Sequence, residues 1–227
     1  VAGVATFTNL RLNRTGTAYT LTASGVGTPP TSAAFNITPA PASVLVFTQQ
    51  PTSAVAGANI TPAVQVTARD SVGNVATSFV ANITVAIGTN PSGGTLSGTT
   101  VVAATAGVAT FATLNINFVG TGYTLAATAT GPTGATSAAF NITAGAAATL
   151  FFTTQPTGAT AGTAMSPAVQ VTARDAQGNT ATGFTGNVTI AIGANPGGST
   201  LSGAPTVAAV AGVATFTNLR LNRTGTA

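Results

Sequence analysis

Apolar and polar residues alternate with a period of two along many short stretches of this chain. The segment PAVQVTARD (62–70) places Val64, Val66 and Ala68 on one face, and NITVAI (82–87) places Ile83, Val85 and Ile87 on one face. Such alternation predicts β-strands with one buried face. Further strands are predicted at residues 44–48, 94–97, 108–113, 123–129 and 137–143, separated by Gly, Pro and Asn turn signals. No segment shows a convincing helical period.

The same segments recur along the chain at a nearly constant spacing. VLVFTQQP at 44–51 returns as TLFFTTQP 105 positions later, and PAVQVTARD returns unchanged at 167–175. TSAAFNIT at 31–38 is repeated at 136–143, and the first 18 residues of the chain are identical to the last 18. A period near 100 residues fits small, independently folding domains in tandem.

The repeat defines the expected domain boundaries, because the Pro/Ala-rich segment 38–43 reads as a junction. We predict the C-terminal part of one repeat at 1–39, a complete repeat at 40–144 and the N-terminal part of the next at 145–227. About eight short strands per repeat predict an all-β fold of tandem immunoglobulin-like antiparallel β-sandwiches. The predicted core of the complete repeat contains Leu45, Phe47, Val64, Val66, Phe79, Ile83, Val85, Ile87, Leu96, Phe111, Tyr123, Leu125, Phe140 and Ile142.

The identical ends of the chain are open to two interpretations. The duplication favours a window on a longer array in which two slightly different domain types alternate. Alternatively, residues 1–38 complete the partial sandwich of another copy by donating its last strands.

Two tyrosines occupy equivalent places in the repeat. Tyr123 follows Gly120, Thr121 and Gly122, and Tyr19 follows a similar segment. A tyrosine at the start of a strand in such a setting predicts a tyrosine corner, in which the hydroxyl bonds back to the preceding chain. Tyr19 and Tyr123 are therefore predicted to have a structural role.

The order of motifs in the repeat resembles that of bacterial immunoglobulin-like domains of the invasin and intimin type. The motifs are VTARD-xx-GN, GGTLSG, GVATF and GTGYTL, and the resemblance extends over the whole chain. It implies a fragment of a large surface or fibre protein whose modules act as spacers, scaffold or adhesive elements. This chain departs from that family in its nearly uncharged surface, which favours lateral packing.

The composition restricts the chemistry that is possible. Hydrophobic residues make up 44% of the chain and charged residues 4%, with six Arg, two Asp and no Glu, Lys, His, Cys or Trp. Acid–base catalysis and metal centres use the missing residue types, so we expect no enzymatic activity and no cofactor. The net charge of +4 comes from scattered arginines, which does not favour nucleic-acid binding. No apolar run is long enough for a membrane span.

The two carboxylates lie in equivalent ARD-xx-GN motifs of different repeats. Asp70 with Asn74, and Asp175 with Asn179, are candidate calcium ligands, because calcium prefers oxygen donors. Since each site offers one carboxylate, an Asp that caps the turn before Gly-Asn is the favoured interpretation. Candidate glycosylation sites in Asn-x-Thr sequons are Asn36, Asn82, Asn141 and Asn187.

These features predict a non-catalytic, extracellular structural protein of the cell surface, built as a rod, filament or sheath. Its expected partners are copies of itself, by head-to-tail and lateral association, because low charge removes mutual repulsion. Two alternatives remain open: an adhesin module that binds glycan, ice or another surface, and an accessory region of a secreted enzyme.

Overall fold

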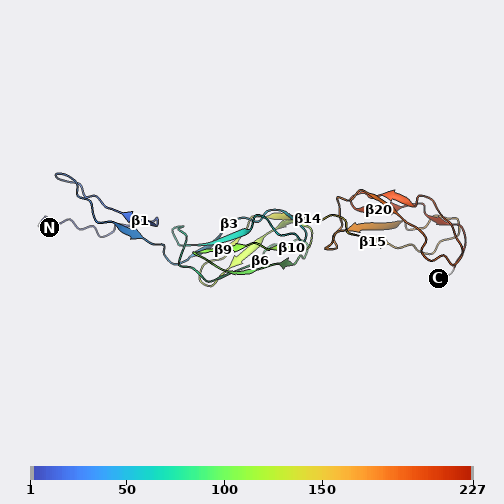
Figure 1. Ribbon diagram of the computed structural model, residues 1–227, viewed down its shortest axis with the longest axis horizontal. Coiled ribbons are helices and arrows are strands. Elements are labelled where there is room, and N and C mark those ends of the chain that lie inside the picture. Colours follow the sequence, from blue (N-terminus) through green and yellow to red (C-terminus); the bar gives the residue numbers. More distant parts are fainter. Residues whose placement is uncertain (1–2, 226–227) are drawn as a thin grey trace.

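The computed structural model describes residues 3–225, and within that range every regular element is a β-strand. No helix among these residues has the length and apolarity needed to span a bilayer. Three bodies follow one another along a single long axis: an N-terminal hairpin, a central sandwich and a C-terminal unit (Figure 1). The tandem all-β architecture predicted from the repeat is therefore confirmed.

The central sandwich contains two main sheets. One has the strand order β3-β5-β9 and the other the order β13-β12-β6-β8, with antiparallel neighbours in both. Their strands are β3 (Val44–Gln49), β5 (Val64–Arg69), β9 (Val108–Phe111), β13 (Ala135–Thr136), β12 (Leu125–Thr128), β6 (Asn82–Ile87) and β8 (Val101–Ala103).

Two smaller sheets complete the central sandwich. One has the order β11-β14-β4 and the other pairs β10 with β7. Their strands are β11 (Gly120–Tyr123), β14 (Phe140–Thr143), β4 (Ala54–Val55), β10 (Asn115–Ile116) and β7 (Leu96–Ser97). β14 pairs with β4 in parallel, which the antiparallel prediction did not include. A parallel pair needs a long connection between its strands, and nearly the whole repeat lies between these two.

One core lies between the sheets of the central sandwich. Most of the predicted core residues are buried there, and Val64, Phe111 and Tyr123 are fully enclosed. Three predicted members, Phe79, Ile87 and Leu96, are half-buried and pack against the core from its edge. The prediction omitted Ile60, Leu114 and Ile116, which are completely buried. Ile60 lies in a loop, Leu114 lies just before the two-residue strand β10, and Ile116 lies in that strand, and in such short or irregular segments a period of two cannot be recognised.

The C-terminal unit repeats the first part of the central sandwich. Its sheets are β15-β16-β20, β17-β19 and β18-β21. The strands are β15 (Thr149–Thr154), β16 (Val169–Arg174), β20 (Val213–Phe216), β17 (Asn187–Thr189), β19 (Thr206–Ala208), β18 (Leu201–Ser202) and β21 (Arg220–Leu221). It has a separate and smaller core, which includes Val169, Val188 and Phe216.

The N-terminal hairpin consists of β1 (Gly16–Tyr19) and β2 (Phe35–Ile37). These strands pair with a register shift at a bulge, just as β11 and β14 do in the central sandwich. The hairpin therefore has the structure of the last part of a repeat. The boundaries at residues 40 and 145 stay predictions, since these contacts do not define where one folding unit ends.

Candidate functional site: the joint between successive units

The two aspartates of the chain lie at the two places where one unit meets the next. Asp70 and Asp175 are 2% and 4% exposed, and they are the only charged side chains buried within residues 3–225. Asp175 follows β16, and Asp70 follows the equivalent strand β5. A buried carboxylate needs hydrogen-bond donors. The donors around each aspartate therefore show which segments of the chain it holds together.

Main-chain N–H groups surround the carboxylate of Asp175. Its Oδ1 accepts from the amides of Gln177 and Asn179, both at 2.9 Å, which closes the turn after β16. Its Oδ2 accepts from the amide of Gly145 at 3.0 Å, in the segment that enters the C-terminal unit. One carboxylate thus fixes both the turn and the linker.

Asp70 makes the same contacts one repeat earlier. Its Oδ1 accepts from the amides of Val72 at 3.1 Å and Asn74 at 2.8 Å, and its Oδ2 accepts from Ala40 at 3.2 Å. Ala40 lies in the linker that leaves the N-terminal hairpin. The arrangement is therefore a property of the repeat.

The asparagine of each ARD-xx-GN motif bonds to the preceding unit. The Nδ2 group of Asn179 donates to the carboxylate of Asp175 and, at 2.9 Å, to the carbonyl oxygen of Asn117. Its Oδ1 accepts from the amide of Val119 at 3.1 Å. Asn117 and Val119 belong to the central sandwich, so one amide side chain joins two units by a donor and an acceptor.

Asn74 forms the corresponding bridge to the N-terminal hairpin. Its Nδ2 donates to the carbonyl of Asn13 at 3.0 Å, and its Oδ1 accepts from the amide of Thr15 at 3.3 Å. Thr15 stands where the other repeat has Val119, but only its main-chain amide takes part. The bridge therefore does not depend on the side chain at that position.

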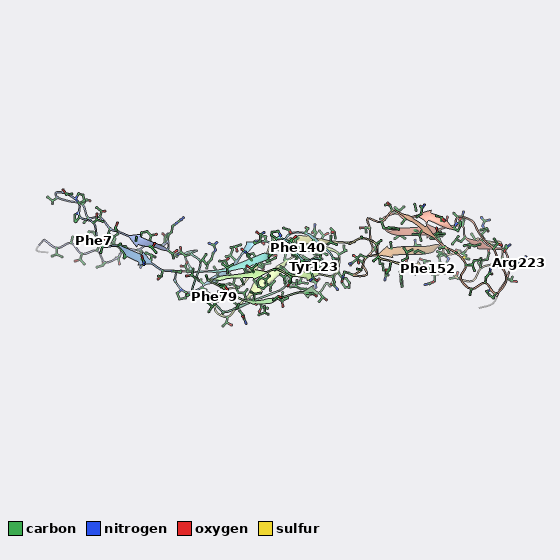
Figure 2. The ribbon with its side chains drawn as sticks, in the orientation of Figure 1. Phe7, Phe79, Tyr123, Phe140, Phe152 and Arg223 are labelled. Carbon is green, nitrogen blue, oxygen red and sulfur yellow. The ribbon has the colours of Figure 1, made fainter. Side chains whose placement is uncertain are left out.

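The tyrosine corners support the loop that each asparagine contacts. The hydroxyl of Tyr123 donates to the carbonyl of Phe118 at 2.9 Å, between the two groups that Asn179 binds. Tyr19 donates to the carbonyl of Arg14 at 3.2 Å, which lies between the groups bound by Asn74. Tyr123 is fully buried beside Phe140 (Figure 2), so its ring anchors this loop in the core.

We call this set of groups the joint. In the second joint it consists of Asp175, Asn179, Asn117, Val119 and Tyr123, and in the first of Asp70, Asn74, Asn13, Thr15 and Tyr19. In each joint a tyrosine supports a loop of one unit, and the asparagine of the next unit binds this loop. The same asparagine donates to the buried aspartate of its own unit. Its contacts across the boundary involve only main-chain groups of the preceding unit.

The hydrogen bonds of the joint lower the pKa of both carboxyl groups. For Asp70 the largest cause is the side-chain hydrogen bond from Asn74, which stabilises the ionised form. For Asp175 burial acts most strongly and in the opposite direction, but the hydrogen bonds from Gly145, Asn179 and Gln177 together outweigh it, so its pKa is also lowered. Both carboxylates are ionised at neutral pH.

The joint residues include all four candidate calcium ligands: Asp70, Asn74, Asp175 and Asn179. The carboxylate oxygens face N–H groups, whose polarity favours an anion and disfavours a cation. Within residues 3–225 no three His, Cys, Asp or Glu side chains gather at one place. The contacts thus agree with the turn-capping interpretation, and calcium binding stays a prediction to be tested.

The four candidate glycosylation sites lie on exposed strand positions. Asn36 and Asn141 use their Oδ1 atoms to accept from the amides of Ala18 and Gly122 at 3.0 Å, next to the bulge of each hairpin. Asn82 and Asn187 are exposed at the starts of β6 and β17. All four are accessible to solvent, and their modification stays a prediction.

Sequence reasoning located Asp70, Asp175 and the two tyrosines but missed that they act together across a boundary. One feature of the sequence pointed to this contact: an asparagine, Asn13 or Asn117, stands six residues before each tyrosine. Their partners are about 60 residues later in the chain, and no periodic pattern connects them.

The sequence matches no protein-family model and no curated protein. The structure is similar to that of surface layer protein SbsC, domains 4–9, with 20% identity over 90% of this chain and a TM-score of 0.35. It is also similar to the S-layer protein SbsC, domains 5–6, with 18% identity, 81% of this chain covered, 87% of that chain covered and a TM-score of 0.33. The chain spans 31% of the longer of these two structures.

Proposed function

We propose that this chain is a segment of an extracellular structural protein at the cell surface, in which successive sandwiches stack into a stiff rod. The same joint recurs at both boundaries, with the same donors and acceptors at equivalent positions, and this recurrence is the main support for the proposal. A flexible linker needs no such contacts, whereas a rod needs a fixed geometry at every step.

The chemistry of the joint supports this role. Each asparagine binds a carbonyl and an amide of the main chain. The joint can therefore form with any preceding repeat that has the same backbone, whatever its side chains. The short linkers are themselves held, because Ala40 and Gly145 donate to the buried carboxylates. A linker fixed at its middle transmits the orientation of one unit to the next.

The surface composition supports association between rods. No charged residue occurs between Ser71 and Ala173, so the central sandwich lacks the repulsion that separates most soluble proteins. A sheath or filament would use such neutral faces for lateral contact between copies. This role requires no catalytic residue and no cofactor.

The rod is tested with arrays of one, two, three and four repeats by small-angle scattering and electron microscopy. The expected result is a maximum dimension that increases in proportion to the number of repeats, with a narrow distribution of angles between units. Broadly distributed angles would contradict the proposal. Antibodies against the central sandwich, applied to intact source cells, test the location, and labelling only after lysis would exclude a surface role.

A further inference from the structure

A further contact crosses the second joint at a glycine of the central sandwich. Gly57 lies in the turn that follows β4, and the side chain of Gln177 from the C-terminal unit lies directly over it. The Nε2 and Cδ atoms of Gln177 are 2.6 and 2.9 Å from the position that a Cβ on Gly57 would occupy. A methyl group there would overlap the glutamine side chain, so only glycine leaves room for it.

A hydrogen bond of the main chain connects this turn to the loop that the bridging asparagine contacts. The amide of Gly57 donates to the carbonyl of Ile116 at 2.9 Å. Ile116 is buried in the core and directly precedes Asn117, whose carbonyl accepts from Asn179. The turn and the loop therefore form one continuous surface at the end of the central sandwich, and both are anchored at the core.

The linker between the two units contacts the same turn. A Cβ on Gly145 would lie 3.5 Å from Cγ1 of Val55 and 3.4 Å from Cβ of Asp175, which are ordinary van der Waals distances. The equivalent linker residue at the first joint is Ala40, so this position accepts a side chain. The two glycines of the second joint thus differ, because position 145 has space for a methyl group and position 57 has none.

The backbone conformation alone does not explain the glycine at position 57. Its φ of +77° lies in the left-handed region, which favours glycine. Elsewhere in the chain, however, Ala18, Ala106 and Ala211 adopt φ values of 60°, 49° and 47°. Since the fold accepts alanine in this region of φ, the close approach of Gln177 is the stronger reason for glycine.

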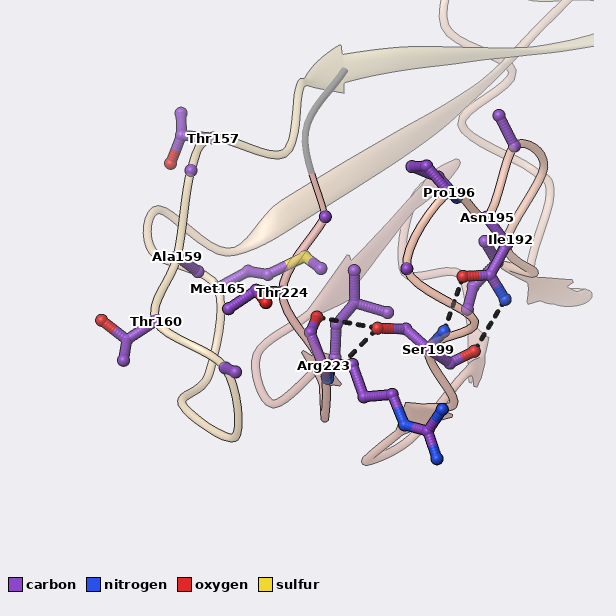
Figure 3. Close-up of a pocket in the computed structure, with 16 residues that line it drawn as sticks. Thr157, Ala159, Thr160, Met165, Ile192, Asn195, Pro196, Ser199, Arg223 and Thr224 are labelled. Carbon is purple, nitrogen blue, oxygen red and sulfur yellow. Dashed lines mark hydrogen bonds between the residues drawn. The ribbon is translucent and has the colours of Figure 1, made fainter.

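The C-terminal unit builds the same turn from different neighbours. Gly162 has a φ of +82°, and its amide donates to the carbonyl of Leu221 at 2.7 Å, in the place of the bond that Gly57 makes. Figure 3 shows this turn, which carries Thr160, at the edge of a pocket that Arg223 also lines. The glycine and its hydrogen bond are therefore the constant features of the turn.

The residue that lies over the glycine differs between the two repeats. Gln177 of the C-terminal unit corresponds to Val72 of the central sandwich, which has a different shape and polarity. The main chain at this position is nevertheless held in the same way, since the amides of Gln177 and Val72 donate to the Oδ1 atoms of Asp175 and Asp70. Each motif thus presents one variable side chain from a fixed turn.

We propose that the turn at residues 54–58 is the docking surface for the ARD-xx-GN turn of the following unit, and that glycine at position 57 is required for the two units to stack in their fixed geometry. A repeat with a larger residue there still folds, but the unit that follows it is displaced. In a longer array such a repeat would introduce a bend at a defined place. The inference rests on the proposed rod and deepens it by naming a second contact that sets its geometry.

The test measures the distance between the two units by pulsed electron paramagnetic resonance. The chain contains no cysteine, so spin labels attach only at Ala86→Cys and Ala208→Cys, which are exposed strand positions in the two units. Gly57→Asn adds a side chain beneath Gln177, and asparagine adopts a positive φ more readily than other residues with side chains. The expected result is a distance distribution that is shifted and broader than that of the labelled chain without the substitution.

Three further variants separate the close approach from other effects of the substitution. Gly162→Asn is the matched control, because a Cβ on Gly162 would meet no described residue within 4 Å apart from its chain neighbours. It should leave the distribution unchanged. Gly145→Ala should also have no effect, since that position has space for a methyl group. Adding Gln177→Ala to Gly57→Asn removes the overlapping side chain and should restore the narrow distribution.

A variant on the other side of the contact keeps the proposal testable if Gly57→Asn lowers the melting temperature of the central sandwich. Gln177→Trp enlarges the residue above the glycine without altering the central sandwich, and it is expected to broaden the distribution in the same way. The proposal is overturned if Gly57→Asn and Gln177→Trp both keep the narrow distribution, or if Gln177→Ala does not restore it. A broad distribution in the labelled chain without these substitutions would instead contradict the rod itself, so the two proposals fail separately.

Discussion

The side-chain amide of Asn179 lies 2.9 Å from the carbonyl oxygen of Asn117, although the two residues belong to different units and are 62 positions apart. Asn74 and Asn13 repeat the contact at 3.0 Å one unit earlier. A contact that recurs with the same atoms is part of the design of the repeat. The same long-range contact therefore fixes how successive units meet at both boundaries.

Removal of the bridging amide should loosen one joint without unfolding either unit. Asn179→Ala deletes the contacts to Asn117 and Val119, each worth about 1 kcal/mol, together with the hydrogen bond to Asp175 within the C-terminal unit. The expected result is a wider distribution of angles between the central sandwich and the C-terminal unit, measured by small-angle scattering. The control is Asn195→Ala, which removes two hydrogen bonds to Ser199 at the far end of the chain. An unchanged distribution in Asn179→Ala would show that the joint does not set the angle.

The hydroxyl of Tyr123 should contribute to the stability of the central sandwich. Tyr123→Phe leaves the buried ring in place but removes the bond to the Phe118 carbonyl, at an expected cost of about 1–2 kcal/mol. Chemical denaturation measures the change in the free energy of unfolding. Tyr19→Phe is the matched control, because Tyr19 lies outside the central sandwich and its substitution should leave that transition unchanged. Equal effects of both substitutions would contradict this assignment.

Acid should weaken both joints. The pKa values of Asp70 and Asp175 are lowered in the folded chain from an ordinary value of 3.8, so the ionised carboxylates stabilise the structure at higher pH. This contribution is complete above pH 3.8 and is lost as the pH falls through the lowered pKa of each group. Thermal unfolding and scattering between pH 7 and pH 2 measure the loss. A chain with Asp70→Asn and Asp175→Asn should respond much less, and an equal response would point to other groups.

Calcium should have no effect on the joints, because the carboxylate oxygens already accept hydrogen bonds from N–H groups. The expected result is the same melting temperature with calcium and with a chelator, measured by calorimetry. A rise in melting temperature that depends on calcium and disappears in Asp175→Asn would instead establish the candidate site as a metal site.

The core of the central sandwich should be sensitive to truncation at Phe111. The side chain is completely buried, so Phe111→Ala is expected to cost about 3–5 kcal/mol by leaving a cavity. Phe118 offers a matched control, because it is 39% exposed and its alanine variant should lose far less. Urea denaturation followed by circular dichroism measures both values. Similar losses would mean that Phe118 is buried by another contact in solution.

The strands of the structure were largely predictable, since alternation of Val, Ile and Thr with polar residues is a local property. Val64, Val66, Ile83 and Val85 follow it and are buried. Ile60 and Leu114 escaped the prediction, because each lies in a segment without regular secondary structure. In such segments tertiary contacts, rather than local alternation of apolar and polar residues, determine which side chains are buried.

By itself the sequence determined the all-β class, the tandem repeat and the positions of both aspartates and both tyrosines. These follow from periodicity and from self-similarity, which do not require knowledge of spatial contacts. Only the tertiary structure decided that Asn74 and Asn179 bridge successive units, and that Ile60 and Leu114 belong to the core of the central sandwich. Both depend on groups far apart in the chain, whose approach is fixed by strand pairing and core packing rather than by any local pattern.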